Sequence, residues 1–155
     1  MVDRFMEQAI ALSIENVRSC AGGPFAALVV RNGSVLATGT NLVTALLDPT
    51  AHAEVVAIRA ACQKAGSFQL IDCVLYTTCE PCPMCMGAIY WARLGKVYYA
   101  NTREDAGRIG FDDSLIYDQL TLPPGERKIP MVQLMRDEAL EAFREWERSP
   151  AKVKY

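Results

Sequence analysis

The sequence lacks the long hydrophobic runs of a membrane protein and the N-terminal pattern of a secreted one. No run approaches the roughly 20 apolar residues that a helix needs to cross a bilayer. At the N-terminus, Asp3, Arg4 and Glu7 precede any long apolar stretch, which is unlike a signal peptide. We therefore expect a cytoplasmic protein that makes no membrane contact.

The chain also lacks an excess of positive charge. It has 16 Lys and Arg against 18 Asp and Glu, a formal net charge of -2, and a pI of about 5.4. Domains that bind nucleic acid usually carry a basic patch or stripe. The composition therefore argues against a nucleic-acid partner and favours a small ligand that is neutral or weakly charged.

Cysteine is present, but its arrangement does not suggest a disulfide framework. Cys82 and Cys85 are crowded beside Cys79, and a secreted scaffold would spread its cysteines more widely. The remaining cysteines are isolated in apolar sequence, where they fit a core as small hydrophobic residues: Cys20, Cys62 and Cys73. A reducing compartment is the simpler interpretation.

Hydrophobic spacing and turn signals divide the chain into alternating helices and strands. We expect helices over residues 5–17, 50–65, 83–93 and 138–147, and strands over residues 25–30, 35–39, 74–77, 97–100 and 131–134. Asn32-Gly33 favours a hairpin between the first two strands, and the order around residues 74–100 indicates a parallel βαβ unit. Because 51% of the 155 residues are hydrophobic, one α/β domain spanning residues 1–155 can bury a core.

The element boundaries carry further expectations. Thr50 is a plausible cap for the second helix, and Gly66 lies just past its end. The charged final helix should turn Leu140, Phe143 and Trp146 inward. The short, mixed and acidic stretch over residues 105–118 is interpreted as a segment that lines a site.

Two short motifs together point to a catalytic zinc site. The only histidine, His52, lies two residues before Glu54, and Pro81-Cys82-Pro83-Met84-Cys85 follows later in the chain. These pieces match the H-x-E and P-C-x-x-C signature of zinc deaminases. One imidazole and two thiolates are three tetrahedral ligands, which leaves a fourth position open for water, as catalytic zinc requires. The spacing predicts one Zn²⁺ per chain, with Glu54 as the proton shuttle.

The local positions of these residues support that chemistry. Cys82 and Cys85 are three residues apart in the first turn of a predicted helix, so both can approach one ion. The positive end of a helix also favours the thiolate form of each cysteine. A structural zinc knuckle is the alternative, with Cys79 as a fourth ligand by spacing, but the Glu that follows the only His favours catalysis.

With these motifs, the chain resembles the cytidine-deaminase-like superfamily, and four segments resemble its bacterial guanine deaminases. The segments are Gly22 to Phe25, Asp48 to Glu54, Cys79 to Trp91 and Gly110 to Asp113. The resemblance implies a three-layer α/β/α fold with a five-stranded mixed sheet and a zinc site at two helix N-termini. It also implies zinc-dependent deamination of guanine to xanthine and ammonia, and a homodimer whose C-terminal segment crosses to the partner subunit.

The resemblance further implies how the purine is held. Asn41 and Asp113 would form hydrogen bonds to the base, Phe25 would pack on its face, and the C-terminal Tyr155 would close the site. From the residues alone, Asp112 and Asp113 are equal candidates, because either carboxylate could accept from the N–H groups of a base edge.

Two classes of alternative remain open. Deaminases of guanosine, cytosine, ammeline or tRNA adenosine would share every zinc residue, although the acidic pI weighs against a tRNA substrate. A non-catalytic zinc scaffold is also conceivable, because a fold alone does not determine function. Glu54 argues against the scaffold, which has no need for a carboxylate beside its metal.

Overall fold

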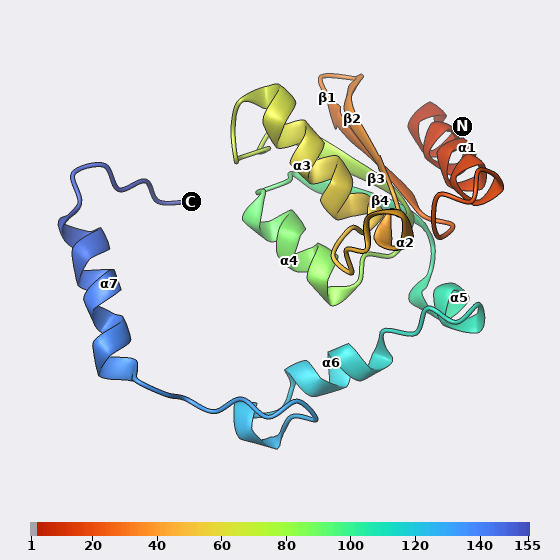
Figure 1. The fold of residues 1–155 in the computed structure, drawn as a ribbon. Coiled ribbons are helices and arrows are strands. Elements are labelled where there is room, and N and C mark those ends of the chain that lie inside the picture. The colour runs from red at the N-terminus through yellow and green to blue at the C-terminus, as the bar shows by residue number, and fades with distance from the viewer. Residues whose placement is uncertain (1–2) are drawn as a thin grey trace. The chain divides into compact units, whose positions relative to one another are not determined.

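A computed structural model describes residues 3–155 of the chain. It contains two compact units, which meet in sequence between Asp113 and Ser114. The first unit holds the β-sheet and the helices that pack on it, whereas the second consists of helices and connecting segments (Figure 1). Among the described residues, no helix combines the length and apolar character needed to cross a membrane.

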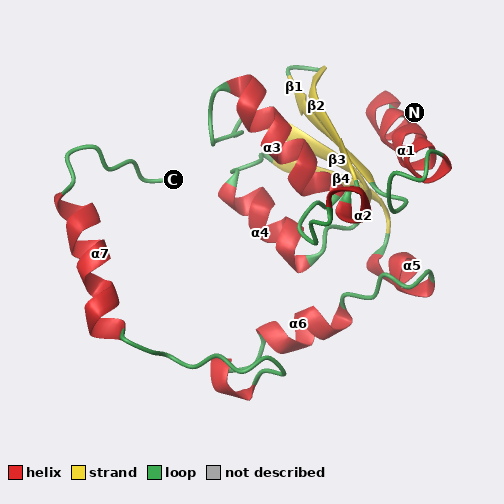
Figure 2. Ribbon diagram, viewed as in Figure 1, coloured by secondary structure: helices red, strands yellow, loops and turns green. Residues whose placement is uncertain are grey.

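The sheet is mixed and has four strands in the order β2-β1-β3-β4. They are β1 (Ala26–Arg31), β2 (Ser34–Thr40), β3 (Cys73–Cys79) and β4 (Lys96–Asn101). β1 pairs antiparallel with both β2 and β3, while β3 and β4 are parallel. The β1–β2 connection is the predicted hairpin (Figure 2). Asn32 and Gly33 both have positive φ, as its tight turn requires.

The expected fifth strand over residues 131–134 is wrong. This segment lies in the second unit and has no strand assignment. Its first residue, Met131, donates its N–H to the carbonyl of Pro124 within the same unit, at 3.2 Å. A strand forms only where a neighbouring strand completes its hydrogen-bond ladder. The described residues of the second unit include no strand that could pair with this segment. The apolar pattern at 131–134 indicated a strand locally, but no neighbouring strand is available to pair with it.

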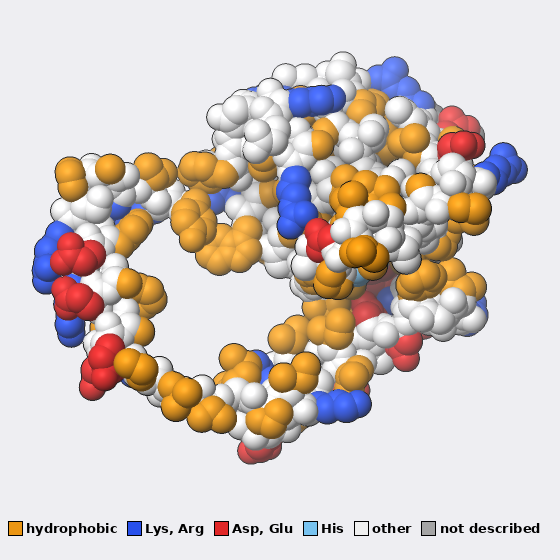
Figure 3. Space-filling view, viewed as in Figure 1, with side chains coloured by type: hydrophobic (Ala, Val, Ile, Leu, Met, Phe, Trp, Pro, Cys, Tyr) orange, Lys and Arg blue, Asp and Glu red, His pale blue; other side chains and the backbone are white. Residues whose placement is uncertain are grey.

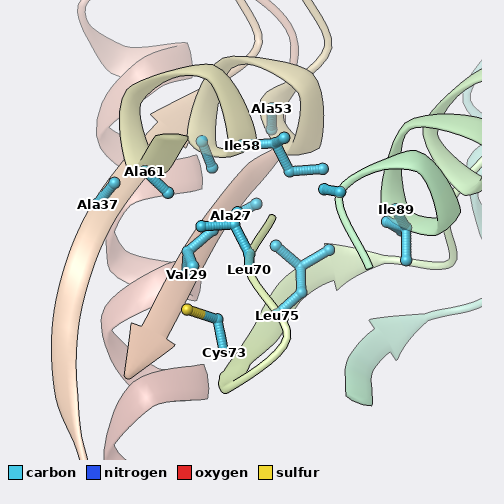
Figure 4. Packing of buried hydrophobic residues seen from close by; sticks show 12 residues of the cluster. Ala27, Val29, Ala37, Ala53, Ile58, Ala61, Leu70, Cys73, Leu75 and Ile89 are labelled. Carbon is cyan, nitrogen blue, oxygen red and sulfur yellow. The ribbon is translucent and has the colours of Figure 1, made fainter. Parts of the chain in front are cut away.

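Helices cover both faces of the sheet, which confirms a three-layer arrangement. On β1, Leu28 and Val30 belong to a core cluster with Ala9 of α1 (Arg4–Arg18). Ala27 and Val29, which point to the other face, belong to a second cluster with residues of α3 (Ala53–Ala65) and α4 (Pro83–Trp91). Figure 4 shows this second cluster. The alternation along one buried strand therefore supplies both cores.

α3 packs very close to β2, and a glycine makes this possible. A Cβ at Gly39 would lie 2.3 Å from the carbonyl oxygen of Ala53 and 2.4 Å from the nitrogen of Ala57. Only hydrogen fits there, so the first turn of α3 rests directly on the strand. Gly66 ends α3 with φ 61°, as predicted.

The predicted cap of α3 is wrong by two residues. His52, with extended φ and ψ, is the N-cap, whereas Thr50 lies in the preceding turn. There the carboxylate of Asp48 accepts hydrogen bonds from the backbone N–H and the hydroxyl of Thr50, at 2.8 and 2.7 Å. The Thr50 side chain is occupied by that turn and so does not cap the helix.

The remaining helices are short, apart from the last. α2 (Val43–Leu46) and α5 (Arg103–Arg108) belong to the first unit. The predicted site-lining stretch divides between α5 and α6 (Ser114–Leu120), and a 3-10 turn, η1 (Pro124–Glu126), follows in the second unit. α7 (Arg136–Arg148) carries charged side chains along one side and hydrophobic ones along the other (Figure 3).

The inward orientation predicted for the final helix is wrong for two of its three residues. Phe143 is 70% exposed and Trp146 42% exposed, whereas Leu140 is partly buried; α7 has no fully buried residue. The helix is amphipathic, as the sequence indicates. The second unit, however, has no buried residue among positions 114–155, so it offers no hydrophobic core against which the apolar side of α7 could pack. An amphipathic pattern specifies that a helix needs an apolar neighbour, not where that neighbour is.

Candidate metal centre and active site

Two helix N-termini bring the three predicted metal ligands together. His52 is the N-cap of α3, Cys82 is the N-cap of α4, and Cys85 lies in the first turn of α4. The Nδ1 atom of His52 is 3.5 Å from Cys82 Sγ and 3.6 Å from Cys85 Sγ. All three ligand atoms lie within 4.8 Å of one another. Residues far apart in sequence thus converge on one point.

The geometry of this cluster fits a zinc ion. Zn–N bonds of about 2.05 Å and Zn–S bonds of about 2.3 Å, at a tetrahedral angle, place the nitrogen and sulfur about 3.5 Å apart. The two observed separations agree with that value. Two sulfurs and one imidazole nitrogen are donors that zinc prefers. The cluster therefore has the shape and the chemistry of a three-ligand zinc site.

The local sequence explains why α4 presents its cysteines in this way. Pro83 occupies the first turn of α4, where the missing N–H costs nothing and the fixed φ favours the helix start. Cys82 keeps an extended conformation as N-cap. One residue outside the helix and one in its first turn can therefore point at the same ion.

The ligands also influence one another's protonation. The interaction of the Cys82 and Cys85 side chains, together with a hydrogen bond from His52, lowers the pKa of Cys82. The same interaction, together with burial, raises the pKa of Cys85. The Cys82 thiolate raises the pKa of His52 through their hydrogen bond. Cys82 is thus prepared as a thiolate, the form that binds metal.

Glu54 lies beside the ligand cluster as a buried carboxylate. It is only 6% exposed, and this burial raises its pKa. Thr77 on β3 donates its hydroxyl to Glu54 Oε1 at 3.1 Å, and Cys85 Sγ donates to Oε2 at 3.4 Å. A carboxyl with a raised pKa beside a metal site is suited to taking up and releasing protons.

Cys79, considered above as a fourth ligand, has a different partner. Its thiol donates to the backbone carbonyl of Thr102 at 3.7 Å, and burial raises its pKa to about 11. The ligand atoms that lie within 4.8 Å of one another do not include the Cys79 thiol. The cluster found among residues 3–155 consists of His52, Cys82 and Cys85.

The predicted substrate residues of the first unit lie in the surrounding loops. Asn41 is buried at the end of β2, where its side-chain oxygen accepts from the N–H groups of Gly23 and Val43. Phe25 is partly buried and meets Phe111 edge-on, with ring centroids 4.9 Å apart. Each makes defined contacts with its neighbours.

The two acidic candidates differ in burial. Asp113 is partly buried, and its pKa is raised mainly by that burial and in part by the negative charge of Cys82. Asp112 is exposed. The electrostatic link to Cys82 associates Asp113 with the metal ligands. Tyr155 belongs to the second unit and is 69% exposed, so its predicted role stays a prediction.

Three polar residues around the site were not singled out from the sequence. Thr77 contacts Glu54, Thr78 accepts a hydrogen bond from the N–H of Ala26, and Glu80 accepts one from the N–H of Arg103. Thr77 and Thr78 lie near the end of β3 and Glu80 follows it, so that all three precede the P-C-x-x-C motif. Their position immediately before a ligand motif is the sequence feature that could have identified them.

A three-ligand zinc site at two helix N-termini, with a buried glutamate beside it, defines a zinc-dependent deaminase. The family model described as the cytidine and deoxycytidylate deaminase zinc-binding region matches residues 1–101. The chain belongs to this family.

Known relatives agree with that assignment over different lengths. The chain is 50% identical to the guanine deaminase of Bacillus subtilis (strain 168) over 153 residues, which cover 99% of this chain and 98% of the relative. The crystal structure of guanine deaminase from Bacillus subtilis matches with a TM-score of 0.96 and 49% identity over 99% of both chains. A tRNA-specific adenosine deaminase of Aquifex aeolicus is 42% identical over 77 residues, half of this chain and 51% of the relative.

Proposed function

We propose that the chain is a guanine deaminase, which hydrolyses guanine to xanthine and ammonia. The observation that carries this proposal is the similarity to the Bacillus subtilis guanine deaminase over 99% of the chain. That match includes residues 114–155, which form a separate compact unit. The tRNA-specific relative covers only half of the chain, and the net charge of -2 gives the chain no overall excess of positive charge to attract a polyanion.

In the proposed reaction, His52, Cys82 and Cys85 hold Zn²⁺, and Glu54 moves the protons. When bound, zinc would supply Lewis-acid polarisation of the attacking water. Glu54 takes a proton from this water, whose oxygen attacks C2 of guanine, and passes the proton to an adjacent ring nitrogen. It then takes the second proton from the hydroxyl now bonded to C2 and gives it to the amino group. The C–N bond breaks as the C2 carbonyl forms, so that water and guanine yield xanthine and ammonia.

The contacts of Glu54 suggest which oxygen carries the proton. Oε1 is held by the Thr77 hydroxyl, while Oε2 accepts from the Cys85 thiol. When Cys85 binds metal as a thiolate it has no proton to donate, and Oε2 becomes available for the substrate. Glu54 would therefore be anchored through one oxygen and react through the other.

The purine would be held by Asn41, Phe25 and Asp113. An amide and a carboxylate can recognise the polar edges of a base, while an aromatic ring can pack against its face. Phe111 supports the Phe25 ring through their edge-on contact. Asp113 is partly buried whereas Asp112 is exposed, which favours Asp113 as the residue that contacts the base.

The proposal also includes a homodimer in which the C-terminal segment crosses to the partner, so that Tyr155 closes a site. The exposed apolar side of α7, with Phe143 and Trp146, supports it, because such a surface needs an apolar neighbour. Residues 1–155 would then form a single domain that exchanges its C-terminal part. A cytoplasmic location fits the six free cysteines, because the ligands must stay reduced to bind metal.

Ammonia release from the purified, zinc-loaded protein tests the proposed activity. Guanine, guanosine, cytosine, adenine and ammeline would be compared at equal concentrations, together with a tRNA that carries adenosine at the wobble position. A strong preference for guanine is expected. Preference for another ring or for the tRNA would replace the substrate, and no release from any of them, with zinc bound, would favour the non-catalytic scaffold.

A further inference from the structure

Asn16 is a buried polar residue on α1 for which the reaction above has no role. It is 5% exposed, and its side-chain amide leaves the helix to reach two carbonyl groups of the first unit. Nδ2 donates to the carbonyl oxygen of Gly23 at 2.8 Å and to that of Asn41 at 2.9 Å. One amide nitrogen has two protons, so these two bonds use its full donor capacity.

The backbone around these two carbonyls is packed closely. A Cβ at Gly22 would lie 2.0 Å from the Asn41 carbonyl oxygen and 3.3 Å from Asn16 Nδ2. Only glycine at position 22 therefore leaves room for the Asn16 hydrogen bonds. The loop that begins at Gly22 and the end of β2 are held together at the point where Asn16 inserts.

This arrangement determines how the Asn41 side chain points. Its Oδ1 accepts from the N–H of Gly23 at 3.3 Å and from the N–H of Val43 at 3.4 Å. Because both neighbours are donors, the oxygen and not the nitrogen must face them. Asn41 Nδ2 has no hydrogen-bond partner among residues 3–155, and no buried side-chain polar atom there lacks one, so this nitrogen is open to solvent.

We propose that Asn16 is a positioning residue for the substrate: it fixes the Gly23 and Asn41 carbonyls, so that the Asn41 amide nitrogen is presented as a hydrogen-bond donor. The inference rests on the proposed function, in which Asn41 contacts the purine. It adds that Asn41 recognises an acceptor atom of the base, such as a ring nitrogen or a carbonyl oxygen. Asn16 itself touches no substrate and acts through Asn41.

Steady-state ammonia release from guanine by Asn16→Leu, Asn41→Ala and the double variant tests this coupling. Asn16→Leu is expected to lower kcat/KM about tenfold, mainly through KM, because the binding interaction is lost in ground state and transition state alike. In the Asn41→Ala background the same change should have less than about a twofold effect. An equal effect in both backgrounds would overturn the proposal, because a general structural defect is independent of Asn41.

Ser13→Ala is the matched control. Ser13 is also buried on α1, but its hydroxyl donates only to the Ile10 carbonyl of the same helix. It should leave KM unchanged, and a tenfold rise in its KM would show that any α1 defect disturbs the site. If Asn16→Leu does not fold, Asn16→Ala removes both donors without placing a larger side chain or a charge against the two carbonyls. The effect of this variant on kcat/KM, compared between the wild-type and Asn41→Ala backgrounds, then tests the proposal.

Hydrogen exchange of the backbone N–H groups of Gly23 and Val43, followed by NMR, separates this inference from the proposed function. Both groups donate to Asn41 Oδ1, so loosening that side chain should speed their exchange in Asn16→Leu but not in Ser13→Ala. Unchanged exchange would overturn the positioning role. Should the wild-type protein fail to release ammonia from guanine, the proposed function fails and the exchange result alone decides the role of Asn16.

Discussion

At the scale of single residues, Glu54 combines burial with two specific hydrogen bonds. Burial raises its pKa, while the bonds from Cys85 and Thr77 act in the opposite direction. Burying a carboxylate costs free energy unless the group is well paired. The position of Glu54 beside three metal ligands gives a functional reason for this cost, because hydrolysis requires a group that takes a proton and returns it.

Glu54→Ala should abolish ammonia release while zinc content stays near one ion per chain. Glu54 lies outside the ligand cluster of His52, Cys82 and Cys85, so metal binding survives when the proton carrier is lost. The measurement is turnover together with atomic absorption. Glu104→Ala, at a side chain that is 68% exposed, is the control and should keep wild-type turnover. Retained activity in Glu54→Ala would remove its assigned role.

Thr77→Val should lower kcat about tenfold, because it removes the hydroxyl that holds Glu54 Oε1. Valine has nearly the same shape as threonine, so the β3 backbone should be unaffected. Thr77→Ser keeps the hydroxyl and is expected to restore most of the rate. Equal rates for the valine and wild-type proteins would show that the Thr77 bond does not hold Glu54 for catalysis.

At the scale of elements, the contact between α3 and β2 controls the metal site. Gly39 allows the first turn of α3 to lie against the strand, and this turn carries Glu54, with His52 as its N-cap. A displacement of α3 would therefore move a metal ligand and the proton carrier together.

Gly39→Ala should destabilise the fold by about 1–3 kcal/mol, because the added methyl group meets backbone atoms of α3 and the clash is relieved only by displacing the helix. It should also lower zinc affinity, since α3 must shift. Urea unfolding and zinc content measure the two effects. Gly87→Ala is the matched control: a Cβ there meets nothing within 4 Å, and alanine in a helix is favoured by up to about 1 kcal/mol. Equal stability of the two variants would contradict the close contact.

At the scale of the whole molecule, zinc should stabilise the fold as well as supply chemistry. Its ligands come from the starts of α3 and α4, so a bound ion would tie these elements together. A strong chelator is expected to abolish turnover and to lower the melting temperature, and added Zn²⁺ should restore both. Calorimetry with and without chelator provides the measurement. An unchanged melting temperature after complete zinc removal would contradict this coupling.

Removal of Tyr155 should impair turnover more than folding, because the residue is 69% exposed and contributes little to a core. Rates and thermal stability of the deletion variant would be compared with those of the full chain. Wild-type rates would exclude Tyr155 from the site.

The proposed homodimer is tested by its mass in solution. Sedimentation equilibrium of the full chain should give about twice the 17.1 kDa of one chain, whereas the mass of a single chain would exclude the proposed exchange.

Features that depend on neighbouring residues could be predicted from the sequence. The hairpin at Asn32-Gly33 and the parallel βαβ unit each have a local signal, and the structure contains both. The H-x-E and P-C-x-x-C motifs identified the three residues whose ligand atoms cluster. Each motif is short enough that the chain itself sets the relative positions of its members.

Contacts between distant residues could not be predicted in this way, because they depend on how the whole chain packs. The Asn16–Asn41 bond joins residues 25 apart and the Thr77–Glu54 bond residues 23 apart, and no local pattern marks either pair. The same limit explains the wrong fifth strand at residues 131–134 and the wrong orientation of Phe143 and Trp146. An apolar pattern specifies the kind of surface a segment requires, whereas the neighbour that supplies that surface depends on how the whole chain packs.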